Sequence, residues 1–293
     1  MINNPKIFTF WEPKEKIPAY IKLCMQTWKK FLPEYEIIIV DYSTLEKYLG
    51  KNFFDDILYK DFPLMLQADA IRCALLKKHG GIWIDADTII TSNEINNYLN
   101  ISSKFVLIGY HVAFIKADKD CSILNSWIKL IRNRISFYKN NKNNLLYVIG
   151  KFIKKLQNFN FPGSNILFRN KLLYKLEKFL HTELFLRMKR WNYFGNDILR
   201  KVLVNNKNFF SIDRIKIKAL PEEIYKDKIK NSEENYRNFY FRNDYSKDVL
   251  NNTKGIILLH NSWTPEKYKK MSKEEFLNQN NTLSNILKKI LAK

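Results

Sequence analysis

Apolar and polar residues alternate along the first part of the chain in a pattern that predicts two strands with a helix between them. The strands are Lys6–Phe10 and Glu36–Val40, and the helix is Pro18–Phe31. Two more apolar runs of strand length lie at Phe105–Ile108 and Val112–Ile115. Strands that alternate with helices are typical of βαβ units, so the pattern predicts an α/β fold with a parallel sheet.

A second helix is predicted over residues 63–79, where apolar residues recur at spacings of four, three and four: Leu64, Ala68, Ile71 and Leu75. Gly80 follows at the position of a left-handed C-cap. Asp69 and Arg72 lie three residues apart and therefore share a neighbouring face of this helix. They form either an ordinary intrahelical ion pair or a pair that binds a ligand.

The stretch after this helix predicts a short strand that ends in two acids, Asp85 and Asp87. Alternate residues of a strand point to the same side, so two carboxylates at this spacing can hold one divalent ion and leave its other positions to phosphate and water. The alternative is a solvated strand end that enters a turn. The spacing alone does not decide, because Asp118 and Asp120 have it too.

Residues 67–87 taken together resemble the signature of sugar-transferring enzymes with an Asp-x-Asp motif. This group includes the capsular polysaccharide synthesis transferases, the yeast-type initiating mannosyltransferases and, more distantly, the glucosyltransferase domain of large clostridial toxins. Residues 5–11, 33–36 and 258–263 are similar to further elements of the same group. Ala68 departs from the pattern, which usually has Ser there. The resemblance implies a GT-A-like, Rossmann-type sheet that binds a nucleotide-sugar.

The resemblance also implies a role for each matching residue. Mn²⁺ or Mg²⁺ is expected on Asp85 and Asp87, with His260 as a third ligand or a hydrogen-bonded rim residue. Trp11 is expected to stack on the nucleobase, although it could equally be a core tryptophan. The other donor-binding residues are expected to be Asp69 at the ribose, Arg72 at a phosphate or at the acidic strand end, and Ser262 and Trp263 at the leaving diphosphate. Trp11, the two acids and His260 all follow apolar runs, and parallel sheets bind ligands at the carboxyl ends of their strands.

The charge is strongly positive, with 50 basic residues against 29 acidic ones and a net charge of +21. No acidic residue lies between Cys121 and Leu176, where basic residues are mixed with bulky apolar ones. This composition is typical of a helix on an anionic membrane surface. It is also what an amphipathic helix packed on the core, or an AT-rich genome, would give. No zinc pattern, RNA-binding signature or helix-turn-helix motif is present, so nucleic acid is not an expected partner.

The expected organisation is one compact unit. Residues 1–120 and 250–270 form the nucleotide-sugar-binding core, residues 121–249 a basic, largely helical region facing the acceptor or a membrane, and residues 271–293 a C-terminal surface helix. The three cysteines have no metal-binding spacing and are expected to be reduced and buried. No secretion leader and no membrane-spanning apolar run is visible, so we expect a cytoplasmic protein, peripheral on the cytosolic face of the inner membrane.

These observations predict a metal-dependent glycosyltransferase that moves a sugar from a nucleotide-sugar to a surface polysaccharide or lipid-linked saccharide. Retention of anomeric configuration is expected from the resemblance. An inverting enzyme would need a base on the acceptor side, for which Asp197 is the candidate, and Gly163 and Asn196 are expected to line the acceptor site. Two alternatives stay open: a basic membrane- or polyanion-binding protein whose transferase site has decayed, and a nucleotide-sugar hydrolase.

Overall fold

The computed structural model of the chain describes residues 5–109, 111–143, 145, 148, 193–220 and 233–292. The loop expected to carry Gly163 lies outside these residues. So does much of the basic region expected between residues 121 and 249.

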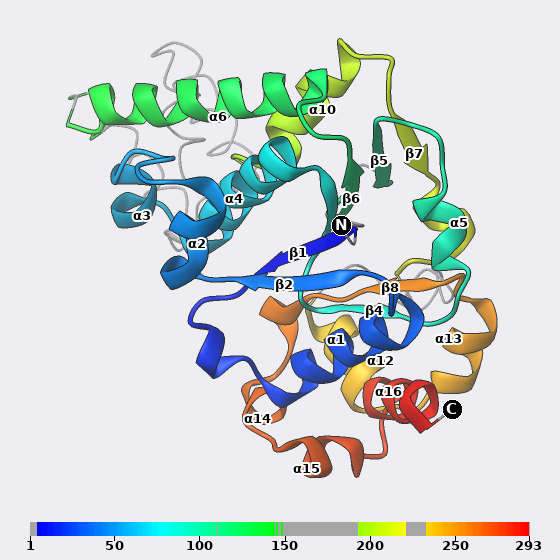
Figure 1. Cartoon of the computed structure of the whole chain (residues 1–293). Helices are drawn as coiled ribbons and strands as arrows, with labels where there is room; N and C mark the ends of the chain where they lie inside the picture. Colours follow the sequence, from blue (N-terminus) through cyan, green and yellow to red (C-terminus); the bar gives the residue numbers. More distant parts are fainter. Residues whose placement is uncertain are drawn as a thin grey trace, which may run out of the picture.

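A six-stranded mixed sheet forms the centre of the protein, with strands in the order β2-β1-β3-β6-β5-β7 (Figure 1). Among the described strands of this sheet, only β6 runs against the direction of the others. The strands are β1 Lys6–Phe10, β2 Glu36–Val40, β3 Gly81–Ile84, β5 Phe105–Ile108, β6 His111–Ala117 and β7 Phe210–Ile212. All four strands expected from the apolar runs are present, with β6 longer at both ends. The α/β class is therefore confirmed.

Helices cover both faces of the sheet. They are α1 Ala19–Phe31, α2 Tyr42–Leu49, α3 Ile57–Asp61, α4 Leu64–His79, α5 Ile95–Leu99, α6 Ser122–Asn141, α10 Asn196–Val204, α11 Arg214–Ile217, α12 Glu233–Phe241, α13 Ser246–Asn252, α14 Glu266–Lys269, α15 Lys273–Leu277 and α16 Thr282–Ala292, with 3-10 turns at η1 Lys14–Lys16 and η3 Asn261–Trp263. Because strand side chains alternate, Ile7 of β1 joins the core with α1, α12 and α16, while Phe8 joins the core with α2, α4 and α6. Figure 1 shows these two helical layers on either side of β1 and β2.

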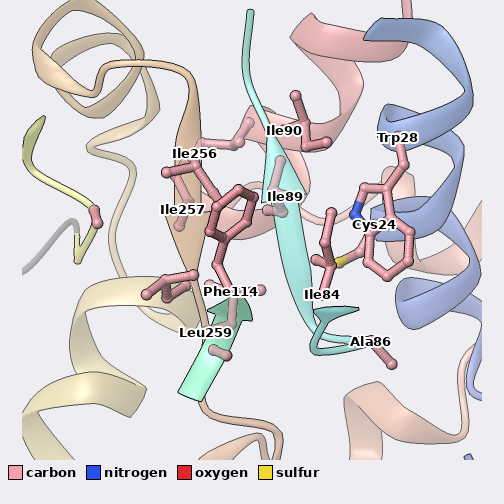
Figure 2. Packing of buried hydrophobic residues seen from close by; sticks show 14 of the residues in the cluster. Cys24, Trp28, Ile84, Ala86, Ile89, Ile90, Phe114, Ile256, Ile257 and Leu259 are labelled. Carbon is pink, nitrogen blue, oxygen red and sulfur yellow. The ribbon is translucent and has the colours of Figure 1, made fainter. Parts of the chain in front are cut away.

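A second, two-stranded sheet joins β4 Thr88–Ile90 to β8 Ile256–Leu258. Figure 2 shows Ile89 of β4 and Ile257 of β8 in a cluster of buried side chains that also holds Trp28 of α1. The Trp28 indole N–H donates to the Thr88 carbonyl at 2.7 Å, which fixes β4 against α1. This small sheet matters because it brings residues near 260 beside the segment that follows β3.

Helix α6 packs its apolar side on α4 and α10. The buried side chains of this helix are Ile123, Leu124, Trp127, Ile128, Ile131, Ile135 and Tyr138. The basic residues Lys129, Arg132 and Lys139 stay exposed on its other side. Of the three interpretations of this stretch, packing on the core therefore accounts for the apolar residues of this helix. No helix in the described part of the chain is long and apolar enough to cross a membrane.

The C-terminal segment differs from the single surface helix expected for residues 271–293. It forms two helices, α15 and α16, and α16 buries Leu283, Ile286, Leu287 and Ile290 against the core. These four residues recur at spacings of three, one and three, so they form one apolar face. Cys24, Cys73 and Cys121 are all buried, as expected.

Candidate functional site

The two acids after β3 lie on a turn rather than along a strand. Strand β3 ends at Ile84, and the Thr88 N–H donates to the Asp85 carbonyl at 2.9 Å, which closes a tight turn over residues 85–88. The expectation that strand alternation puts both carboxylates on one side is therefore wrong in its geometry. The turn instead reverses the chain into β4, and both acidic side chains stay partly accessible to solvent.

Asp85 is held by two donors from the surrounding framework. Arg72 Nη2 and Trp83 Nε1 both donate to its Oδ1, at 2.8 and 2.6 Å. The guanidinium carbon of Arg72 also lies 4.8 Å from the centroid of the Trp83 ring, so each donor fixes the other. Among the residues that the structure describes, none donates to Asp85 Oδ2. One oxygen is thus anchored, and the other is available to a ligand.

Asp69 is enclosed by the same arginine. Arg72 Nη1 donates to Asp69 Oδ1 at 2.9 Å, and only 9% of the Asp69 side chain is exposed. The other oxygen, Oδ2, faces Gly195, where an added Cβ would lie 2.4 Å away. Burial raises the pKa of Asp69 to about 7, with Arg72 opposing the shift and Asp85 adding to it. This enclosure favours a positioning role, and the expected contact of Asp69 with ribose stays a prediction.

Asp87 lies on the other side of the turn, against the segment that follows β8. Thr88 pairs with Leu258, so the register places Asp87 beside Leu259, next to His260. Asp87 Oδ2 accepts the backbone N–H of Asn261 at 2.7 Å. Burial, followed by the neighbouring charge of Asp85, raises the pKa of Asp87 to about 7. The turn therefore carries negative charge that the one paired arginine compensates only in part.

This donor set fits a divalent cation held by two carboxylates. Asp85 and Asp87 each use one oxygen in the framework, and a cation between them would compensate the charge that raises the pKa of Asp87. No group of three or more His, Cys, Asp or Glu side chains in a metal-binding arrangement occurs in the described ranges. His260 therefore does not complete such a group with the two acids. Mg²⁺-type sites often use one or two carboxylates together with substrate phosphates.

His260 belongs to an aromatic cluster at the same end of the sheet. Its ring lies 4.5 Å from the Trp263 ring and 5.6 Å from the Tyr236 ring, between centroids. Burial lowers the pKa of His260, so its imidazole is neutral near pH 7. Trp263 is partly buried and Ser262 is exposed beside it. The structure thus brings all three near Asp87, through the contact between Asn261 and that acid.

The chain matches a known protein family. A family model described as "Capsular polysaccharide synthesis protein" matches residues 1–280. The chain belongs to this family. The resemblance first seen in the motif between Gln67 and Asp87 is therefore confirmed for nearly the whole length of the chain.

Two curated relatives match a shorter segment. Lactosylceramide 4-alpha-galactosyltransferase from Mus musculus is 43% identical over 58 residues, and the protein of that name from Rattus norvegicus is 41% identical over 58 residues. Each match spans 19% of this chain and 16% of the relative. Among solved structures, one named PaToxG Glycosyltransferase matches 68% of this chain and 85% of its own at 18% identity, with a TM-score of 0.32.

The remaining predicted residues lie on other elements of the fold. Trp11 follows β1 directly and is partly buried, with its backbone N–H donating to the Val40 carbonyl at 3.0 Å. Asn196 and Asp197 open α10 next to Gly195 and are partly buried. Asn196 Oδ1 is buried and has no hydrogen-bond partner among the described residues. Gly163 lies outside them.

Three residues of the site escaped the sequence analysis: Trp83, Gly195 and His111. Trp83 lies inside an apolar strand run and Gly195 has no side chain, so neither is marked as a ligand-type residue by its own type. His111 starts β6 and lies within electrostatic reach of Asp85, His260 and Arg72. Burial is the main cause that lowers its pKa to about 4, and His260 and Arg72 add to the shift. The sequence could mark His111 only by its place at the start of a strand. That place becomes informative only when the order of β3 and β6 is known.

Proposed function

We propose that this family member is a metal-dependent glycosyltransferase that moves a sugar from a nucleotide-sugar to a saccharide or lipid-linked saccharide of a surface polysaccharide. The observation that carries the proposal is the buried Arg72, which binds both Asp69 and Asp85 and leaves one oxygen of Asp85 uncommitted. A solvated strand end would not need a buried guanidinium and an indole N–H to orient a single oxygen. The family and the galactosyltransferase matches support sugar transfer.

In this proposal the acids of the turn, Asp85 and Asp87, would hold Mn²⁺ or Mg²⁺, and His260 lies beside them in the aromatic cluster with Trp263. The bound ion would act as a Lewis acid that neutralises charge on the diphosphate leaving group. Trp11 offers its ring to the nucleobase from the neighbouring strand end. Ser262 and the Trp263 indole N–H follow Asn261, whose backbone N–H binds Asp87, and in this proposal they donate to diphosphate oxygens.

The acceptor enters over α10 in this proposal, because Asn196 keeps a buried amide oxygen without a partner among the described residues, close to Gly195 and Asp69. Retention of anomeric configuration, with front-face attack and no protein nucleophile, is the expected stereochemistry. Asp197 is the base that an inverting reaction would require. The anomeric configuration of the product, read by proton NMR, decides between the two.

The exposed basic side of α6 supports a peripheral location on the cytosolic face of the inner membrane. Lys129 and Arg132 lie about one helical turn apart on that side, whereas Lys139 is already paired with Asp55 at 2.8 Å. Each basic residue near an anionic leaflet contributes about 1 kcal/mol, so two give a weak, salt-sensitive attachment. Sedimentation with anionic vesicles at low and high salt tests this part separately from catalysis.

Nucleotide release from a panel of UDP- and GDP-sugars with Mn²⁺, with and without a lipid-linked saccharide acceptor, tests the proposed reaction. Release that depends on the acceptor and disappears in Asp87→Asn supports transfer. Asp118→Asn is the matched control, because Asp118 begins the second Asp-x-Asp and is exposed. Release that does not depend on the acceptor would indicate a hydrolase. Vesicle binding without turnover of any donor would indicate a binding protein.

A further inference from the structure

His111 and the acidic turn lie at the same end of the two neighbouring strands β6 and β3. Strand β6 runs antiparallel to β3, so the start of β6 meets the end of β3. The contact is direct through the backbone, since the Asp85 N–H donates to the Ala113 carbonyl at 2.8 Å. His111 is two residues before Ala113 and is partly exposed.

The hydrogen bonding of the His111 ring fixes where its proton sits. The backbone N–H of Ala113 donates to His111 Nδ1 at 3.1 Å, so Nδ1 carries a lone pair and no proton. The neutral ring then has its one proton on Nε2. In the part of the chain that the structure describes, Nε2 has no hydrogen-bond partner. His111 therefore offers a donor, and it lacks the free lone pair at Nε2 that a metal would need.

The strand order gives the direction in which a nucleotide-sugar would lie across the ends of β1, β3 and β6. Trp11 follows β1, Asp85 follows the adjacent β3, and His111 starts the next strand, β6. With the base at Trp11 and the diphosphate at Asp85, the sugar comes next, because the molecule runs from base through diphosphate to sugar. Neighbouring strands are about 4.8 Å apart, so His111 lies about one strand spacing beyond the diphosphate position.

We propose that His111 recognises the transferred sugar by donating a hydrogen bond from Nε2–H to one of its hydroxyl groups. The inference rests on the proposed glycosyltransferase function and adds a specificity residue to it. His111 is thus distinct in place from His260, whose ring packs on those of Trp263 and Tyr236. Arg214 packs against Gly109, between β5 and β6, and its charge helps to lower the pKa of His111.

Isothermal titration with Mg²⁺ tests this role by comparing donors that contain the sugar with the nucleotide that lacks it. The probes are UDP-galactose, UDP-glucose, UDP-N-acetylglucosamine and GDP-mannose, each paired with UDP or GDP. For the nucleotide-sugar that binds, His111→Ala should weaken binding about three- to tenfold, which is the effect of one lost hydrogen bond. The affinity for UDP or GDP should change less than about twofold, because the diphosphate contacts stay. His111→Gln, which keeps a donor, should recover part of the loss.

A histidine remote from the turn provides the matched control. His79 lies at the other end of α4, where its Nε2 is 2.8 Å from the Tyr48 carbonyl, and His79→Ala should leave both affinities unchanged. Equal weakening of UDP and UDP-sugar by His111→Ala would overturn the sugar contact and place His111 at the diphosphate. Unchanged binding of both would overturn any contact with the donor. If the wild-type protein binds none of the four donors, the proposed function fails, and this inference fails with it.

Discussion

The chain contains two Asp-x-Asp sequences, and the fold gives them opposite surroundings. Asp85 and Asp87 follow β3, whereas Asp118 and Asp120 follow β6. Because β6 runs antiparallel to β3, the two pairs lie at opposite ends of these strands. The first pair meets Arg72, Trp83 and the Asn261 N–H.

The second pair is solvated. Asp118 is exposed, and Asp120 forms an ion pair with Lys77 in which 55% of the Asp120 side chain and 31% of the Lys77 side chain are exposed. Helix α6 begins directly after this pair, and its N-cap residue, Cys121, makes no side-chain cap bond. The same spacing thus gives a candidate ligand site or an ordinary surface, depending on what the remainder of the chain places around it.

Removing one carboxylate from each pair should give the largest contrast. Asp87→Asn should lower turnover at least ~1000-fold, because the variant loses half of the acidic metal-binding pair. Asp118→Asn should keep turnover within about twofold of wild type. Steady-state rates at saturating donor measure both, with thermal unfolding as a check of the fold. Comparable losses in the two variants would contradict the assignment of the site.

The next contrast compares the cations that pair with each acidic segment. Arg72→Met leaves Asp69 buried without its partner and should lower the free energy of unfolding by about 3 kcal/mol. Lys77→Met breaks the exposed pair with Asp120 and should cost about 0–1 kcal/mol. Urea unfolding at pH 7 measures both values. A loss in Arg72→Met no larger than that in Lys77→Met would show that the buried pairs do not hold the turn.

Replacing an indole N–H separates the orientation of Asp85 from general stability. Trp83→Phe removes the donor to Asp85 Oδ1 and should weaken Mn²⁺ binding about tenfold, as loss of a second-layer partner of a metal ligand does. Trp127→Phe removes an equally buried donor, to the Phe194 carbonyl, and is the control. Both should cost about 1 kcal/mol of stability. Titration calorimetry with Mn²⁺ would contradict the role of Trp83 if the two variants bound equally.

The smallest expected effect is a pH dependence confined to the first pair. The pKa of Asp87 is about 7 in the folded protein against 3.8 in the unfolded chain, so folding favours the protonated acid. This contribution is fully present below pH 4 and is lost as the pH rises through 7. Mg²⁺ requires the ionised acid, so its stabilising effect should increase between pH 5 and pH 8.

Melting temperatures with and without Mg²⁺ at pH 5 to 8 measure this dependence. Asp87→Asn should abolish it, and Asp118→Asn should retain it. A Mg²⁺ effect of the same size at every pH would show that Asp87 does not titrate with metal binding.

Local patterns predicted much of the scaffold. Strands β1, β2 and β5 have the bounds expected from the apolar runs, and α4 begins one residue after the expected start, because Pro63 is its N-cap. The helix periodicity also placed Asp69 and Arg72 on neighbouring faces, and the structure joins them in a buried ion pair. Periodicity reports contacts within a helix or strand, and these features depend on nothing else.

The features that were missed depend on contacts between distant parts of the chain. Gly195 approaches Asp69, and Asn261 donates to Asp87, across gaps of more than one hundred residues that no local pattern spans. The local pattern predicted a strand end where the structure has a turn at residues 85–88. The strand after this turn, β4, pairs with β8, which lies far along the chain and is invisible to a local pattern. Likewise, His111 acquires its neighbours only from the order of β3 and β6.

Gly195 approaches Asp69 closely, so the pKa of the Asp69 carboxyl group shows whether the segment around Gly195 has packed against α4. Until residues 193–197 dock, water reaches Asp69, and we expect its proton to leave at ordinary acidic pH. Docking removes that water, and the same proton is then held to near neutrality. A chain in which this segment has not docked would hold that proton more weakly near neutral pH, which an NMR titration of the carboxyl carbon would register.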